Sequence, residues 1–231
     1  MFKNYQFRMS AILVMLLAVF AACNQSARTE NSGDTETVLT APPDWARNSV
    51  IYEVNLRQYS DEGSIRAFIK EMPRLKELGV DILWLMPVHP IGEKNRKGTL
   101  GSYYSVRDYL DVNPEFGTKE DFKQLVDEAH KLGMYVIIDW VANHTAWDNK
   151  MIEDHPEWYT KDSLGNMIAP FGWSDVAELD YDQQALRDYM IQALMYWVDD
   201  MNIDGFRCDV AGMVPTDFWE AARDSLESIK P

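Results

Sequence analysis

Hydrophobic residues recur along the chain in two alternating patterns, one typical of strands and one typical of helices. Short apolar runs, rich in β-branched and aromatic residues, predict buried strands over residues 50–57, 80–87, 134–141 and 203–210. Apolar positions at helical spacing predict helices over residues 64–78, 118–132, 185–201 and 215–229. We expect Gly79 and Gly133 to end the first two helices and Pro73 to kink or shorten the first.

Strands that alternate with helices predict an α/β fold with a parallel sheet and right-handed crossovers. Both an open doubly wound sheet and part of a (β/α)8 TIM barrel fit this order. No glycine-rich nucleotide motif follows any strand, and polar residues gather where the strands end, which is where barrel enzymes hold their catalytic residues. We therefore favour the barrel, with residues 145–181, which lack a clear periodicity, inserted after the third strand.

The first 22 residues are typical of a targeting segment rather than of a fold. They contain Lys3 and Arg8, no acidic residue, and an apolar run over 10–22 that is too short to span a bilayer. The run ends in Ala-Ala-Cys23 and resembles a bacterial lipoprotein signal, which implies lipidation of Cys23; an ordinary signal peptide cut nearby would leave Cys23 incidental. Residues 23–44 are polar and predict a flexible tether. We therefore expect an exported domain over 45–231, anchored at a bacterial membrane in the periplasm or on the cell surface.

Composition narrows the classes of partner. The 231 residues include 37 acidic and 22 Lys or Arg side chains, a formal net charge of −15. Nucleic-acid binding needs clustered basic residues, so this charge argues against it. Eight Trp and eleven Tyr favour an aromatic cleft for a flat ligand, and two Cys allow at most one disulfide.

Arg207 and Asp209 lie two residues apart in the fourth predicted strand, so both point to the face that Gly205 shares, and Cys208 points to the other face. A charged pair on a buried strand is costly unless it is paired or functional. Arg207 would keep Asp209 ionised and oriented, which suits a nucleophile for glycosyl transfer. A purely structural Arg–Asp pair fits the same spacing. On the other face of the strand, Cys208 is expected to pack against the outer helices.

The third predicted strand ends in a second polar group. Asp139 and Asn143 alternate to one face, and His144 follows. Asn143 offers an oxygen to a hard cation, and His144 offers a hydrogen bond to a substrate hydroxyl. Each residue alone fits a loop-capping role as well, but their position at the same barrel end as Asp209 favours a shared site.

Two segments carry a specific resemblance. D-W-V-A-N-H at 139–144 and G-F-R-C-D-V-A at 205–211 resemble the strand-three and strand-four signatures of the α-amylase family of glycoside hydrolases, and segments 83–88 and 101–109 also match in order. The resemblance implies that residues 145–181 form a short domain B, whose aromatic residues line the cleft or pack the loop. It also implies roles in the site: Asp209 as nucleophile, Arg207 as its orienting partner, Asp139 as a brace for Arg207, His144 as a sugar contact and Tyr104 as the ring that stacks under the sugar.

The resemblance further implies Asn143 as a calcium ligand, as in calcium-dependent amylases. Two departures leave calcium open: Glu178 stands at the aligned acidic position, and Gly212 and Met213 stand where typical α-amylases have Lys-His. The same departures leave plain endo-acting α-amylase activity open, against a relative that acts on other α-glucosides.

A complete barrel has eight strands and typically about 250 residues. The segment 45–231 is shorter than that, and only four strands are predicted in it. In the family the acid/base Glu lies on strand five, so we expect the N-terminal half of a retaining glycoside hydrolase that acts on α-glucans or α-glucosides and is inactive alone, with open edges at strands one and four. The alternative is a non-catalytic, surface-tethered glucan-binding protein on the same scaffold. An unrelated barrel would require both motifs to match by chance.

Overall fold

The computed structural model describes residues 42–230. The chain divides into residues 1–44 and a compact unit over Trp45–Pro231. The expected signal, Cys23 and the tether through residue 41 lie outside the described residues. Within the described part, no helix combines the length and apolarity that a membrane span requires.

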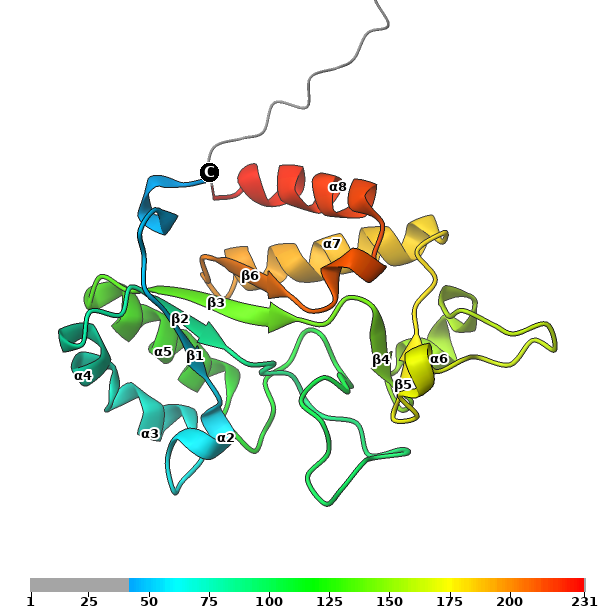
Figure 1. The fold of residues 1–231 in the computed structure, drawn as a ribbon, viewed down its shortest axis with the longest axis horizontal. Coiled ribbons are helices and arrows are strands. Elements are labelled where there is room, and N and C mark those ends of the chain that lie inside the picture. Colours follow the sequence, from blue (N-terminus) through cyan, green and yellow to red (C-terminus); the bar gives the residue numbers. More distant parts are fainter. Residues whose placement is uncertain (1–41, 231) are drawn as a thin grey trace, which may run out of the picture. The chain divides into compact units, whose positions relative to one another are not determined.

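Four parallel strands form the central sheet, in the order β1-β2-β3-β6 (Figure 1). They are β1 (Ile51–Val54), β2 (Ile82–Leu85), β3 (Tyr135–Trp140) and β6 (Gly205–Cys208). The predicted α/β fold with a parallel sheet is therefore confirmed. Among the described residues β1 and β6 are the edges of this sheet, which is open rather than closed into a barrel.

Helices flank the sheet as the apolar spacing predicts (Figure 1). They are α3 (Ile65–Ile69), α4 (Met72–Glu77), α5 (Lys119–Lys131), α7 (Gln184–Asp199) and α8 (Thr216–Glu227), with short 3-10 turns η1 (Asp44–Ala46) and η4 (Ala211–Met213). Thr118 and Asp121 start α5 with a reciprocal capping box. Gly79 and Gly133 follow α4 and α5 with φ of 91° and 68°, which a residue with a Cβ adopts only at a cost.

Most predicted elements differ from the structure by one to three residues at their ends, and two differ in kind. The helix predicted over 64–78 is two helices, because Pro73 lies in the first turn of α4, where its missing N–H is tolerated but the preceding helix cannot continue through it. The strand predicted over 50–57 is wrong beyond Val54, because the next residues turn into α2 (Leu56–Tyr59). Asn55 ends the strand, and its Oδ1 accepts a hydrogen bond from the hydroxyl of Tyr103 at 3.0 Å.

The two faces of the sheet differ in what covers them. One face packs against the helices, with Leu83, Leu85, Ile138 and Trp140 fully buried. The alternate residues face the other way, and this face is open in part, since Ile51 on it is 55% exposed. The polar side chains of β3 and β6 lie on this second face, so the core and the candidate site occupy opposite sides of one sheet.

The segment after β3 folds into short elements around a two-stranded antiparallel sheet. The strands are β4 (His144–Ala146) and β5 (Val176–Glu178), and the segment between them contains α6 (Met151–Asp154), η2 (Pro156–Trp158) and η3 (Pro170–Gly172). Trp158 and Tyr159 are buried and belong to the hydrophobic core. These two aromatic side chains therefore pack the inserted segment rather than line a cleft.

Candidate active site

Asp139, Arg207 and Asp209 form one connected group at the ends of β3 and β6. Asp139 and Arg207 are partners in the parallel register. The Nη1 atom of Arg207 donates to Oδ1 and Oδ2 of Asp139 at 3.0 and 3.1 Å, and to Oδ1 of Asp209 at 2.9 Å. The guanidinium carbon also lies 5.1 Å from the ring centre of Trp84 on β2, so an aromatic face supports the cation.

Burial and neighbouring charges shift the pKa values of the residues in this group. Burial raises the pKa of Asp139 to about 6, although the hydrogen bond and charge of Arg207 oppose the shift. Burial lowers the pKa of Arg207, but its bonds and charge interactions with Asp139 and Asp209 outweigh burial and raise it overall. The hydroxyl of Tyr104 donates to Oδ2 of Asp139 at 3.2 Å. Burial, and then the charge of Asp139, raise the pKa of Tyr104 well above its ordinary value, so Tyr104 stays a hydrogen-bond donor.

The backbone changes direction immediately after Asp209. The amide of Asp209 donates to the carbonyl of Trp140 at 2.9 Å, which continues the parallel ladder by one residue. Val210 then has φ 40° and ψ 40°, a left-handed conformation that is strained for a β-branched residue. The turn directs the chain into η4 and leaves the Asp209 carboxylate at the edge of the sheet. The strand pattern gave no signal for this strain.

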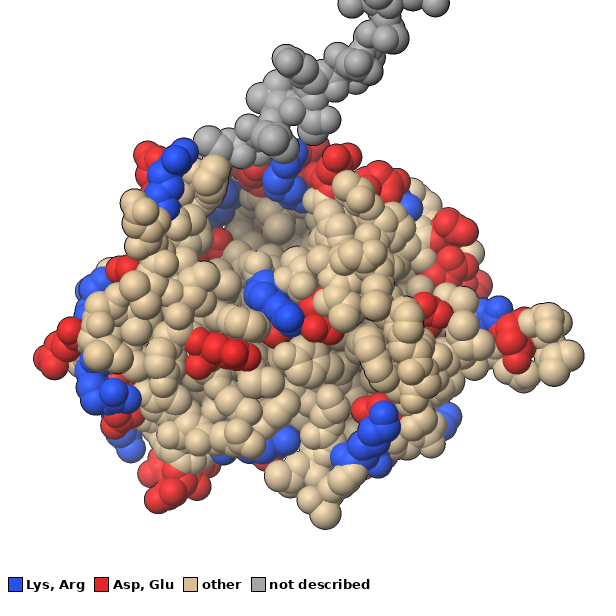
Figure 2. Space-filling view, viewed as in Figure 1, with Lys and Arg blue, Asp and Glu red and all other residues tan. Residues whose placement is uncertain are grey.

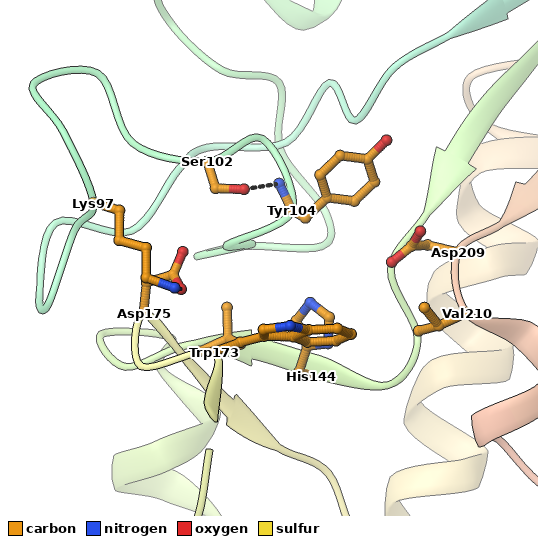
Figure 3. Close-up of a pocket in the computed structure, with 9 residues that line it drawn as sticks. Lys97, Ser102, Tyr104, His144, Trp173, Asp175, Asp209 and Val210 are labelled. Carbon is orange, nitrogen blue, oxygen red and sulfur yellow. Dashed lines mark hydrogen bonds and ion pairs between the residues drawn. The ribbon is translucent and has the colours of Figure 1, made fainter. Parts of the chain in front are cut away.

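A cleft of about 400 Å³ opens in front of Asp209, within the size range of small-molecule sites. Figure 3 shows Tyr104 and Trp173 on opposite sides of this cleft, with Asp209 toward one end. The residues that line it are Lys97, Ser102, Tyr104, His144, Trp173, Asp175, Val176, Asp209 and Val210. Two facing aromatic rings and a carboxylate at one end suit a ring-shaped polar ligand such as a sugar.

His144 begins β4 and lies under the cleft beside Trp173, with ring centres 5.5 Å apart. Burial lowers its pKa, against the opposing charges of Asp209 and Asp175, so the ring is neutral near pH 7. Its Nδ1 lies 3.3 Å from Nδ2 of Asn143. With Nδ1 unprotonated, the Asn143 amide is the donor and the other ring nitrogen carries the proton.

The calcium prediction concerns the surroundings of Asn143. Asn143 is buried and directs its amide nitrogen toward His144. Across residues 42–230, no three His, Cys, Asp or Glu side chains converge as a metal site. Glu178 lies opposite His144 in the register of β4 and β5, and burial raises its pKa. Calcium binding at Asn143 therefore stays a prediction.

The structure thus brings the predicted site residues of the folded unit into one group: Asn143 does not line the cleft but contacts His144, which does. Cys208 lies on the opposite face of β6, and burial raises the pKa of its thiol to about 11. Sequence reasoning missed Lys97 and Asp175, which lie in loops without periodicity.

On the face shown in Figure 2, lysine and arginine side chains are interspersed with aspartate and glutamate.

Comparison with known proteins shows the family of the chain. The sequence profile of the α-amylase catalytic domain matches residues 23–173 and 147–228. The chain belongs to the α-amylase family. The α-amylase family resemblance seen in the two strand signatures is therefore confirmed, and the open parallel sheet corresponds to part of the catalytic barrel of this family.

Among solved α-amylase structures, the enzyme from Lactobacillus plantarum is 49% identical, with a TM-score of 0.76, and the match covers 78% of this chain and 43% of that one. The maltogenic α-amylase AmyB from Thermotoga neapolitana is 46% identical, with a TM-score of 0.75 and coverage of 80% and 44%. Alpha-amylase MalA from Haloarcula japonica is 33% identical over 193 residues, 79% of this chain and 28% of that protein. The chain thus spans less than half the length of these relatives.

Proposed function

We propose that this chain carries the nucleophile of a retaining glycoside hydrolase that acts on α-glucans or α-glucosides, with Asp209 as the nucleophile. The observation that supports this most is the bond from Arg207 Nη1 to Oδ1 of Asp209, at 2.9 Å, beside the cleft. A carboxylate that is fixed by a cation and opens on an aromatic cleft matches what a double displacement requires.

In the proposed reaction the sugar ring lies between Tyr104 and Trp173, with its anomeric carbon at Asp209. Arg207 holds Oδ1 of Asp209, which leaves Oδ2 to attack the anomeric carbon as the bond to the leaving oxygen breaks. The leaving oxygen takes a proton from a general acid, and a covalent glycosyl ester forms on Asp209. Water then attacks the same carbon and gives a proton to the conjugate base of the general acid, the ester bond breaks, and the Asp209 carboxylate and the acid are regenerated with retained configuration.

The general acid of this reaction needs a second carboxyl group about 5–5.5 Å from the first. Glu220 and Glu227 lie on α8, and Glu178 lies on β5; none of the three lines the cleft. Asp175 does line it, but it is paired with Lys97 at 2.7 Å. The proposed reaction therefore requires a general acid that residues 42–230 do not supply.

A test of the nucleophile follows from this division of roles. A glycosyl fluoride has a leaving group that departs without protonation, so 5-fluoro-α-D-glucosyl fluoride should esterify Asp209 even where the general acid is absent. Peptide mapping by mass spectrometry should place the label on Asp209, Asp209→Asn should abolish it, and Asp224→Asn on the surface of α8 should not. Binding of maltotriose without any labelling would favour the non-catalytic glucan-binding alternative.

We also infer export and lipid anchoring from residues 1–23, where the support is the sequence alone: a basic start, an apolar run and Ala-Ala before Cys23. Expression in a bacterial host with a labelled fatty acid should label the chain and place it in the membrane fraction. Cys23→Ser should lose both the label and the membrane association. A labelled Cys23→Ser chain would contradict the anchor.

A further inference from the structure

Lys97 and Asp175 form an ion pair at the end of the cleft opposite Asp209 (Figure 3). Nζ of Lys97 lies 2.7 Å from Oδ1 of Asp175, and the Asp175 side chain is only 8% exposed, against 54% for Lys97. Both residues line the cleft. They belong to the loop after β2 and to the loop before β5, so the pair joins two separate segments across the end of the site.

The Asp175 side of this pair is fixed by buried contacts. The hydroxyl of Ser105, which is buried, donates to the carbonyl of Asp175 at 3.0 Å. The indole nitrogen of Trp147 donates to the carbonyl of the preceding residue, Ser174, also at 3.0 Å. These two bonds hold the backbone at Ser174 and Asp175 in place, so the carboxylate is presented to the cleft at a defined position.

The Lys97 side is fixed by its own loop. The guanidinium of the neighbouring Arg96 donates to the carbonyl of Gly92 at 2.8 Å and to those of Ile91 and Thr99 at 3.4 Å. A Cβ at Gly92 would lie 2.3 Å from the Cβ of Ala146, so the loop packs directly on β4. The ammonium group therefore extends from an ordered support.

The direction of a bound sugar follows from the proposed nucleophile. In a glucopyranose ring, O4 lies across the ring from the anomeric carbon. With the anomeric carbon at Asp209 and the ring or rings between Tyr104 and Trp173, the O4 end of the glycone points along the cleft toward Lys97 and Asp175 (Figure 3). That end is the non-reducing end of an α-glucan.

We propose that Lys97 and Asp175 form the end wall of the glycone site and bind the hydroxyl groups of the non-reducing terminal glucose, so that the site selects chain ends of α-glucosides. This inference rests on the proposed function. The ammonium donates to, and the carboxylate accepts from, sugar hydroxyls, and such charge-assisted hydrogen bonds are among the stronger ones. A chain that continues beyond O4 would have to displace the pair and leave a buried carboxylate without its partner.

The test uses p-nitrophenyl α-glucoside, α-maltoside and α-maltotrioside, each with a free non-reducing end and with a 4,6-O-ethylidene cap. Binding to the full 231-residue chain is measured by titration calorimetry. For the glycoside whose length fills the cleft, the cap should weaken binding by about tenfold or more, because it removes two hydroxyls and adds bulk next to Lys97 and Asp175. Lys97→Met should reduce this discrimination to about twofold, since one partner of the hydroxyls is lost.

Lys94→Met is the matched control, because Lys94 is an exposed lysine in the same loop that does not line the cleft; it should keep the full effect of the cap. Asp175→Asn provides a second variant on the opposite partner and should also reduce discrimination. An equal affinity for capped and free ligands at every length would overturn the inference, as would discrimination that persists in both variants. Failure of every uncapped ligand to bind would instead contradict the proposed function itself.

Discussion

One nitrogen of Arg207, Nη1, donates to both carboxylate oxygens of Asp139, at 3.0 and 3.1 Å. The Asp139 side chain is fully buried, whereas that of Arg207 is 38% exposed. The cation at the mouth of the site therefore serves two carboxylates: it compensates a buried charge on β3 and orients Asp209 toward the cleft. Stability and site geometry depend on the same side chain.

Replacing Arg207 should consequently affect folding as well as function. Arg207→Met leaves the buried Asp139 carboxylate without its cation, and the free energy of unfolding should fall by about 2–4 kcal/mol. Urea unfolding measures this change. Arg223→Met, which removes an arginine from a surface pair on α8, should cost less than about 1 kcal/mol. Adding Asp139→Asn to Arg207→Met should recover part of the loss, and a purely additive double variant would contradict the coupling.

The raised pKa of Asp139 predicts a dependence of stability on pH. Its ordinary value is 3.8 and its value in the fold is about 6, so between these values the folded state binds more protons than the unfolded state. Stability from this group is therefore present below pH 4 and is lost as pH rises through 6. The difference in free energy of unfolding between the parent and Asp139→Asn should change by roughly 2 kcal/mol across this window.

Chemical unfolding at several pH values between 4 and 7 measures this difference. Asp224→Asn, a surface change on α8, controls for general charge effects. A parent-minus-variant difference that stays constant across the window, or that changes in the opposite direction, would contradict the assignment of the raised pKa to Asp139.

The rings of Tyr104 and Trp173, on opposite sides of the cleft, should each contribute to sugar binding. Tyr104→Ala removes the ring on one side, and the affinity for maltotriose should fall by about tenfold. Tyr104→Phe removes only the hydroxyl that donates to Asp139 and should stay within about threefold of the parent. Trp173→Ala should resemble Tyr104→Ala. Titration calorimetry decides the point, and equal losses in the Phe and Ala variants would show that stacking on Tyr104 contributes little.

Much of this site follows from local sequence patterns. Period-two alternation places Arg207 and Asp209 on one face of β6, and apolar runs mark the four strands that bring β3 beside β6. The pairing of Asp139 with Arg207 depends in addition on the register of parallel strands, which the chain sets through long-range packing. For that step the α-amylase family signatures supplied what periodicity could not.

The rest of the site depends on contacts that no local pattern records. Lys97 and Asp175 meet because two irregular loops are held by Arg96 and Ser105, and neither loop has a repeating spacing. The first strand ends early because α2 begins at Leu56, although the apolar run continues. Among the inserted aromatics, tertiary packing alone decides that Trp158 is buried in the core and Trp173 lines the cleft.

The left-handed backbone of Val210 predicts strain stored beside Asp209. At φ 40° and ψ 40° a β-branched residue costs about 1–3 kcal/mol, and Asn tolerates this conformation far better. Val210→Asn should therefore raise the free energy of unfolding by about 1 kcal/mol in urea titrations, whereas the same change at Val50, which is exposed and precedes β1, should not stabilise. Because Val210 lines the cleft, labelling of Asp209 by the glycosyl fluoride should slow as the turn relaxes. A destabilised Val210→Asn chain would show that packing of the valine side chain outweighs the strain.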